Sequence, residues 1–271
     1  MLWKPDESNG VDLGPWSVLR AGQHLDEQPL AAPLAPGVDG STAGTAGCAA
    51  CRQGDLLALD IATWARDGRL VGGFSPTRTL SVTTAARLLA DGQEIAAPAS
   101  GYGGFALPAT ATTLRLDLES TKSAPWTTTS TRIDTSWVWP TADGTGTLPE
   151  QRLCPDGSHA CGFEPLLFLD YDAGVSQANG VPATAMLTVR VTAHHQPFDQ
   201  APAADQLTFD ISGDDGATWV PATVVATGGG GFTATAMPPA GSRFLAFRVH
   251  AGDPAGSGID QTVLRAVQVT G

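Results

Sequence analysis

The sequence has few basic residues and no long apolar run. Of its 271 residues only Lys4 and Lys122 are lysines, and the formal net charge at pH 7 is −12. No basic stripe occurs, so we expect no nucleic-acid partner, because phosphate binding requires clustered cations. No apolar run approaches the roughly 20 residues that span a bilayer, so we expect no membrane span. The first ten residues, MLWKPDESNG, lack the apolar core of a signal peptide, so we expect any export signal to lie upstream.

Long amphipathic helical repeats are also missing, whereas Gly (32 residues) and Pro (20 residues) are frequent. Short alternating segments separated by turns predict an all-β fold. Two examples are residues 113–119 (TLRLDLE) and residues 132–139 (RIDTSWVW). In the second, Trp137 and Trp139 share a face, which favours a core position over a sugar-binding platform. Residues 29–54 are rich in Pro, Gly and Ala and predict a long loop.

The length is natural for two domains of roughly 100–150 residues each. We expect two tandem β-sandwich domains. Residues 1–140 form the first, which is sandwich- or jelly-roll-like, and residues 141–162 form a polar linker. Residues 163–271 form the second, an immunoglobulin- or fibronectin-like sandwich, because its strand patterns recur at regular short intervals.

The four cysteines form two close pairs in the sequence, Cys48 with Cys51 and Cys154 with Cys161. Local disulfides are the favoured interpretation, and they place the protein outside a reducing cytosol. A Cys₄ zinc site is less favoured because the six-residue spacer is too loose for a zinc knuckle. A redox-active CxxC lacks a βαβ context. Cross-pairing and free thiols stay open.

Residues 207–220 (LTFDISGDDGATWV) predict a hairpin, because two alternating segments flank a Gly/Asp turn. The string also resembles the Asp-box hairpin of sialidase propellers and many secreted β-domains. In that motif the aspartate, here Asp214, ties down the turn, and the tryptophan, here Trp219, packs beneath it. The resemblance implies a folding element without catalytic function. A propeller would repeat the motif in each blade, and here it occurs once.

Acidic turns of the second segment are candidate calcium ligands, because calcium takes six to eight oxygens. The candidates are Asp214, Asp215, Asp253 and Asp260. The D-x-D-x-D-G pattern is absent, and local turn geometry explains the same residues. Trp126 is the best candidate for an exposed sugar-stacking aromatic, followed by Tyr102 and Phe105. The adjacent residues His194 and His195 point to opposite faces of a strand, and we expect both to lie on the surface at its end.

Seven strings occur in an order that resembles the non-catalytic C-terminal region of secreted subtilisin-like serine peptidases of high-GC bacteria. The resemblance spans roughly residues 55–271, and the strings are LLADGQEI, SGYGGFALPA, PWTTTSTRIDTSWVW, PLLFLDYDAG, LTVRVTAHHQ, ISGDDGATWVPA and FRVHAGDPAGSGIDQTVLRA. The final strand matches only approximately, and neither the cysteine-rich loop nor the second cysteine pair corresponds to a family feature. The family's catalytic Asp, HGT and GTSM motifs are absent, so no catalytic residue carries over.

The resemblance implies a secreted accessory region with no catalysis of its own, attached to an upstream protease domain. Such a region would stabilise the enzyme, position protein substrate or attach it to a surface. An independent carbohydrate- or cell-wall-binding module is the alternative. A hydrolase is a third class, and a glycosidase would need two carboxylates facing each other across a cleft.

Overall fold

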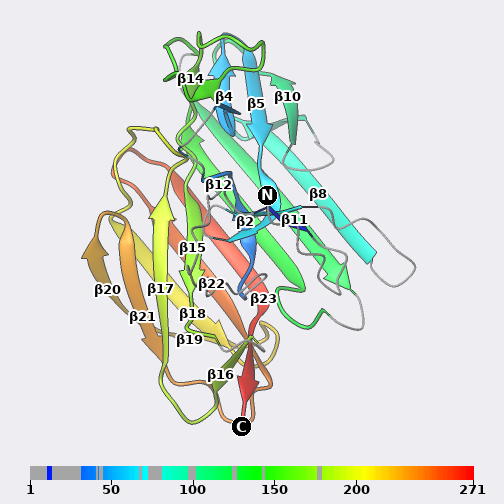
Figure 1. The fold of residues 1–271 in the computed structure, drawn as a ribbon, viewed down its shortest axis with the longest axis vertical. Coiled ribbons are helices and arrows are strands. Elements are labelled where there is room, and N and C mark those ends of the chain that lie inside the picture. The colour runs from blue at the N-terminus through cyan, green and yellow to red at the C-terminus, as the bar shows by residue number, and fades with distance from the viewer. Residues whose placement is uncertain are drawn as a thin grey trace, which may run out of the picture.

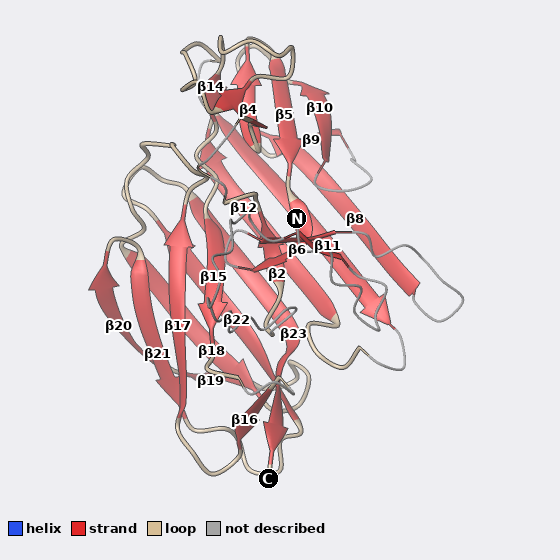
Figure 2. Cartoon of the chain, in the orientation of Figure 1, coloured by secondary structure: helices blue, strands red, loops and turns tan. Residues whose placement is uncertain are grey.

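The structure is a computed structural model that describes residues 11–13, 32–40, 42, 45–66, 69–72, 81–96, 102–123, 127–141, 144–175 and 179–271. Every regular element among these residues is a β-strand, which confirms the predicted all-β class (Figure 2). No helix of the described residues has the length and apolarity to cross a membrane.

The largest sheet has nine strands, eight of them in the order β19-β18-β22-β23-β12-β11-β8-β9, and β16 pairs with β23 in parallel. Their bounds are β8 (Ser81–Ala90), β9 (Gln93–Ala96), β11 (Thr113–Ser123), β12 (Arg132–Pro140), β16 (Gly180–Pro182), β18 (Gln206–Ser212), β19 (Val220–Pro221), β22 (Phe244–Gly252) and β23 (Gly258–Thr270). The long strands β8, β11 and β12 run diagonally across Figure 1.

Four smaller sheets accompany it. The first is β1-β7-β6-β2, with β1 (Val11–Leu13), β2 (Ala35–Gly37), β6 (Ala62–Arg66) and β7 (Arg69–Gly72). The second is β10-β5-β4-β14, with β4 (Ala50–Gln53), β5 (Leu56–Asp60), β10 (Tyr102–Ala106) and β14 (Gly162–Phe163). The third pairs β3 (Ala46–Gly47) with β13 (Arg152–Leu153). The fourth is β15-β17-β21-β20, with β15 (Phe168–Asp172), β17 (Leu187–His194), β20 (Thr223–Gly228) and β21 (Gly231–Ala236).

Alternation along each long strand gives the nine-stranded sheet one apolar and one polar face. On β11, Leu114, Leu116 and Leu118 are buried, while the residues between them are exposed or half-buried. On β12, Trp137 and Trp139 are fully buried on the same side, as the sequence predicts. Because side chains alternate across a strand, the intervening polar residues lie on the opposite face, which we call the outer face.

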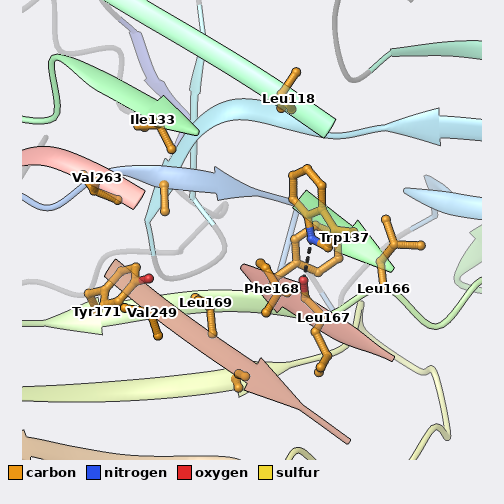
Figure 3. Close-up of a cluster of buried hydrophobic side chains, with 14 of the residues drawn as sticks. Leu118, Ile133, Trp137, Leu166, Leu167, Phe168, Leu169, Tyr171, Val249 and Val263 are labelled. Atoms are coloured by element: carbon orange, nitrogen blue, oxygen red, sulfur yellow. Dashed lines mark hydrogen bonds between the residues drawn. The ribbon is translucent and has the colours of Figure 1, made fainter. Parts of the chain in front are cut away.

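Three of the smaller sheets, through residues of β2, β5 and β15, share a core with the apolar face. Tyr171 of β15 and Phe247 of β22 have ring centroids 6.2 Å apart, and Phe168 of β15 lies at the same distance from Trp137. Figure 3 shows Phe168 beside Trp137, with the indole of Trp137 hydrogen-bonded to the main chain of Leu167. Leu57 of β5 belongs to the same buried cluster. One core therefore contacts both halves of the sheet.

The nine-stranded sheet combines strands from both sides of residues 141–162. Seven residue pairs, from Arg132 with Leu264 to Val138 with Gly258, join β12 to β23. The two expected segments therefore share a sheet as well as a core. Their division into domains at residues 141–162 stays a prediction.

The turn predicted within residues 207–220 agrees with the structure, and the loop predicted over residues 29–54 agrees only in part. The hairpin of β8 and β9 turns at Asp91 and Gly92, both with positive φ, and β18 pairs with β19 across the predicted Gly/Asp turn. The prediction of a loop over residues 29–54 was wrong in part, because β2, β3 and β4 fall within it. These strands are short and contain small residues, so they show no apolar alternation that would predict a strand.

Candidate binding face

The outer face carries two rows of side chains that cross six neighbouring strands. Strand register places one residue from each of β8, β11, β12, β23, β22 and β18 side by side. The first row is Arg87, Asp117, Ser136, Asp260, His250 and Thr208. The second row is Ala85, Glu119, Asp134, Thr262, Arg248 and Asp210. Opposite positions on neighbouring strands have Cβ atoms about 5 Å apart, so each row is a continuous band of side chains.

All twelve residues line a single hollow of about 570 Å³, which we call the groove. That volume lies within the range of roughly 300–1,000 Å³ typical of ligand sites. Between the two rows, parts of buried residues such as Leu118 and Val249 reach the groove. Because the side chains of these residues lie on the apolar face, the groove has a polar lining over a base of main-chain atoms.

An ion pair and a hydrogen bond hold polar groups of the groove in place. Arg248 donates from Nε and Nη2 to Oδ2 of Asp210, at 3.0 and 2.8 Å. His250 Nδ1 lies 2.9 Å from Oδ1 of Asp260. Exposed pairs of this kind contribute only about 0–1 kcal/mol to folding. Their main effect is to fix the orientation of the charged groups.

The other acidic side chains of the groove pair with arginines beside it. Arg132 donates to Asp134 at 3.0 Å and lies 3.3 Å from Glu119, and Arg115 donates to Asp117 at 2.8 Å. The hydrogen bond to Asp134, with the nearby negative charge of Glu119, raises the pKa of the Arg132 guanidinium. The guanidinium therefore stays charged between the two carboxylates.

An aromatic side chain flanks one end of the groove. The Trp219 ring centroid lies 4.6 Å from the guanidinium carbon of Arg248, within cation–π distance. Trp219 is half-buried, and its ring covers Gly216, where an added Cβ would lie 3.3 Å from Cζ2. The hairpin turn therefore positions both the indole and the arginine that stacks on it.

The turn is held by Asp214, as the Asp-box resemblance implies. Its carboxylate accepts hydrogen bonds from Ser212 Oγ (2.7 Å), Thr218 N (2.9 Å) and Thr218 Oγ1 (2.6 Å). Hydrogen bonds from Ser212 and Thr218 lower the pKa of Asp214 to about 2. The neighbouring Asp215 pairs with Arg265 at 2.8 Å.

The structure does not bring the four candidate calcium ligands together. Asp214 and Asp215 serve the turn, and Asp260 faces His250 in the groove. Asp253 is buried, and its Oδ1 accepts hydrogen bonds from the main-chain nitrogens of Ala255 and Ser257. Among the described residues, no group of three or more His, Cys, Asp and Glu side chains is placed to hold a metal ion. Calcium binding at these aspartates stays a prediction.

The three candidate sugar-stacking aromatics lie away from the groove or outside the described residues. Trp126 lies outside them. Tyr102 is on β10, where its backbone pairs with Asp60, but its side chain is outside the described part. Phe105 is half-buried and packs on the core, with its ring over Gly103 of the same strand. Their role in binding stays a prediction.

The cysteine prediction is confirmed, with disulfides joining Cys48 to Cys51 and Cys154 to Cys161. In each bridge the Cα atoms are 6.0 Å apart. The four cysteines pack with Leu148 in a small cluster of their own. They brace the end of the molecule near β4 and β14, seen at the top of Figure 1.

His195 is a buried, hydrogen-bonded residue, which the sequence did not indicate. Its ring is buried rather than exposed, so the expectation of a surface position was wrong for this histidine. Nδ1 lies 3.1 Å from the main-chain oxygen of Leu166, and Nε2 lies 3.0 Å from that of Pro202 and 3.2 Å from Oδ2 of Asp253. These partners come from distant segments, so no local pattern signals them.

The sequence also did not identify the groove residues as a group. Each appears in the sequence only as the polar member of an alternating strand. The groove residues become neighbours only because strands far apart in the sequence, from β8 to β18, join one sheet.

The chain matches no protein-family model, and no curated protein matches it.

Proposed function

We propose that this chain is a non-catalytic accessory region of a secreted subtilisin-like protease, and that it binds a substrate or a surface through the groove. The observation that carries the binding role is the set of twelve aligned side chains across six strands. A hollow of this size, lined by oriented charged groups, offers a ligand both room and hydrogen-bonding partners. The link to a protease rests on the order of the seven strings in the sequence.

Two features support the non-catalytic assignment. The groove contains no serine paired with a histidine, because its one serine, Ser136, has Asp117 and Asp260 as its cross-strand neighbours. Serine-protease chemistry requires a nucleophile against a histidine base and an oxyanion hole. Glu119 and Asp134 share Arg132 as their partner, whereas a glycosidase needs one carboxyl group to carry a proton.

We also infer a tandem pair of β-sandwiches, the second immunoglobulin-like, in an exported protein. The packing of the β15-β17-β21-β20 sheet on β22 supports the second sandwich. Buried residues of β5 and β11 in one cluster support the first. The two disulfides support an oxidising location.

An independent carbohydrate- or cell-wall-binding module is the second candidate, and the groove favours it equally. The upstream reading frame distinguishes the two. A contiguous protease domain supports the accessory region, and a complete signal peptide directly before residue 1 supports the independent module.

The purified chain tests both parts of the proposal. We expect no labelling by a fluorophosphonate probe, no cleavage of casein, and co-sedimentation with insoluble protein substrate or bacterial cell walls. Arg248→Ala should reduce sedimentation, because it removes a groove cation that orients Asp210. Arg190→Ala is the matched control, since Arg190 is an exposed mid-strand arginine of β17 that pairs with Asp172 of β15, outside the groove. Probe labelling would overturn the non-catalytic assignment, and equal retention of the two variants would overturn binding through the groove.

A further inference from the structure

We propose that the groove binds a linear, uncharged polysaccharide that lies across the strands. This inference rests on the proposed binding role and names the ligand class. Its first support is dimension. The rows cross six strands, and five interstrand steps of about 4.8 Å span about 24 Å. An extended chain of several sugar rings fits that length.

The second support is the hydrogen-bonding chemistry of the rows. Carboxylates accept, guanidinium groups donate, and the hydroxyls of Ser136, Thr208 and Thr262 do both. A sugar hydroxyl also donates and accepts. Neighbouring donors and acceptors such as Arg248 and Asp210 therefore match adjacent hydroxyls of one ring, each group using hydrogen-bonding positions that the ion pair leaves unused.

The third support is that the binding groups are already ordered. Arg248, Asp210, Asp260 and His250 are paired before any ligand arrives. Binding then costs little side-chain entropy, which matters for a ligand that offers only hydroxyl groups. The indole of Trp219, at the end of the groove, stacks on the guanidinium of Arg248 and adds to its ordering.

The charges of the groove disfavour the binding of a polyanion. Five carboxylates line it, against two arginines and one histidine; they are Asp117, Glu119, Asp134, Asp210 and Asp260. Juxtaposed like charges disfavour an anionic chain. A cationic ligand would have to compete with the arginines and the histidine that already pair with these carboxylates.

The backbone decides against an extended peptide. A peptide that adds to a sheet needs an exposed strand edge, but the four central strands of the groove, β11, β12, β23 and β22, pair with neighbours on both sides. None of the large exposed apolar side chains found among the described residues lines the groove, so apolar peptide anchors have no pocket there.

Affinity electrophoresis of the whole chain tests the inference, with hydroxyethyl cellulose and a neutral mannan as the uncharged polysaccharides. Polygalacturonate serves as the polyanion and denatured casein as the peptide. We expect retardation by at least one neutral polymer and none by polygalacturonate or casein. Arg248→Ala and Thr262→Val should each weaken that retardation at least tenfold. Thr188→Val, at an exposed position of β17, and Arg190→Ala should leave it unchanged.

The outcomes separate this inference from the proposed function. Thermal unfolding of each variant identifies loss of fold, and Thr262→Val preserves side-chain shape if Arg248→Ala fails to fold. Retardation by polygalacturonate or casein alone, or equal retardation of Thr262→Val and Thr188→Val, overturns the polysaccharide site. If no soluble glycan binds but Arg248→Ala still lowers sedimentation with insoluble protein, the proposed function stands and this inference fails. If neither assay responds to the groove variants, both fail.

Discussion

The indole nitrogen of Trp137 donates a 2.7 Å hydrogen bond to the main-chain oxygen of Leu167 (Figure 3). Both groups are buried. Trp137 lies on β12 in the nine-stranded sheet, and Leu167 directly precedes β15 in the sheet that covers it. One side chain thus links the two layers and fills the space between them.

Trp137→Phe should destabilise the fold by about 2–4 kcal/mol, because it leaves the Leu167 oxygen unpaired and removes buried volume. Urea unfolding would measure the change. Val138→Ala is the control, since Val138 is 37% exposed on the outer face, and it should cost less than about 1 kcal/mol. Similar losses for both variants would mean that the indole does not hold the layers together.

Two adjacent glycines in the β20–β21 turn offer a matched test of backbone packing. Gly229 and Gly230 both have positive φ, but a Cβ on Gly230 would lie 2.2 Å from the main-chain oxygen of Ala193. A Cβ on Gly229 would meet nothing within 4 Å. Gly229→Ala should therefore cost about 1 kcal/mol from backbone strain, and Gly230→Ala about 1–3 kcal/mol more. Equal melting temperatures for the two variants would contradict this geometry.

Stability should fall in acid partly through Asp214. Its pKa is lowered to about 2 in the folded chain, below the usual aspartate value near 3.9. The folded state therefore favours the ionised form, which stabilises fully above about pH 4 and progressively less as pH falls towards 2. Asp214→Asn should lower the melting temperature at pH 6 and reduce the loss between pH 5 and pH 2. The same substitution at Asp205, an exposed residue before β18, should leave that pH profile unchanged.

What the sequence predicts correctly depends on neighbours along the chain. Alternation placed Trp137 and Trp139 on one buried face, and Gly/Asp chemistry identified the turn at Asp214. Cysteine proximity predicted both disulfides. Each of these depends on backbone geometry within about ten residues.

The groove and the shared sheet depend on register between distant strands. Asp117 and Asp260 become part of one row only when β12 pairs with both β11 and β23. That register is set by packing of the opposite face, where Leu116, Trp137 and Ile259 are aligned. No pattern within a single strand contains this information.

Gln196 gives the most direct test of a contact between distant parts of the chain. It is buried beside β4, and its Oε1 accepts hydrogen bonds from the main-chain nitrogens of Ala49 (3.2 Å) and Ala50 (3.3 Å). Its Nε2 donates to the main-chain oxygens of Ala50 (2.7 Å) and Glu164 (3.3 Å). Donors and acceptors are therefore both needed at this position.

Gln196→Glu should cost about 3 kcal/mol or more at pH 7, because a buried carboxylate cannot donate and would face two carbonyl oxygens. The loss should shrink as the pH falls from 7 towards about 4, since a protonated carboxyl group carries no charge and can donate one hydrogen bond. Gln200→Glu is the matched control, because Gln200 is exposed and its amide donates only to the nearby oxygens of Phe198 and Asp199. Unfolding in urea at pH 4 and pH 7 would show a pH-dependent loss for Gln196→Glu alone. If the two variants lose equal stability at both pH values, Gln196 does not join β4 to the segment after β17 in the way the structure shows.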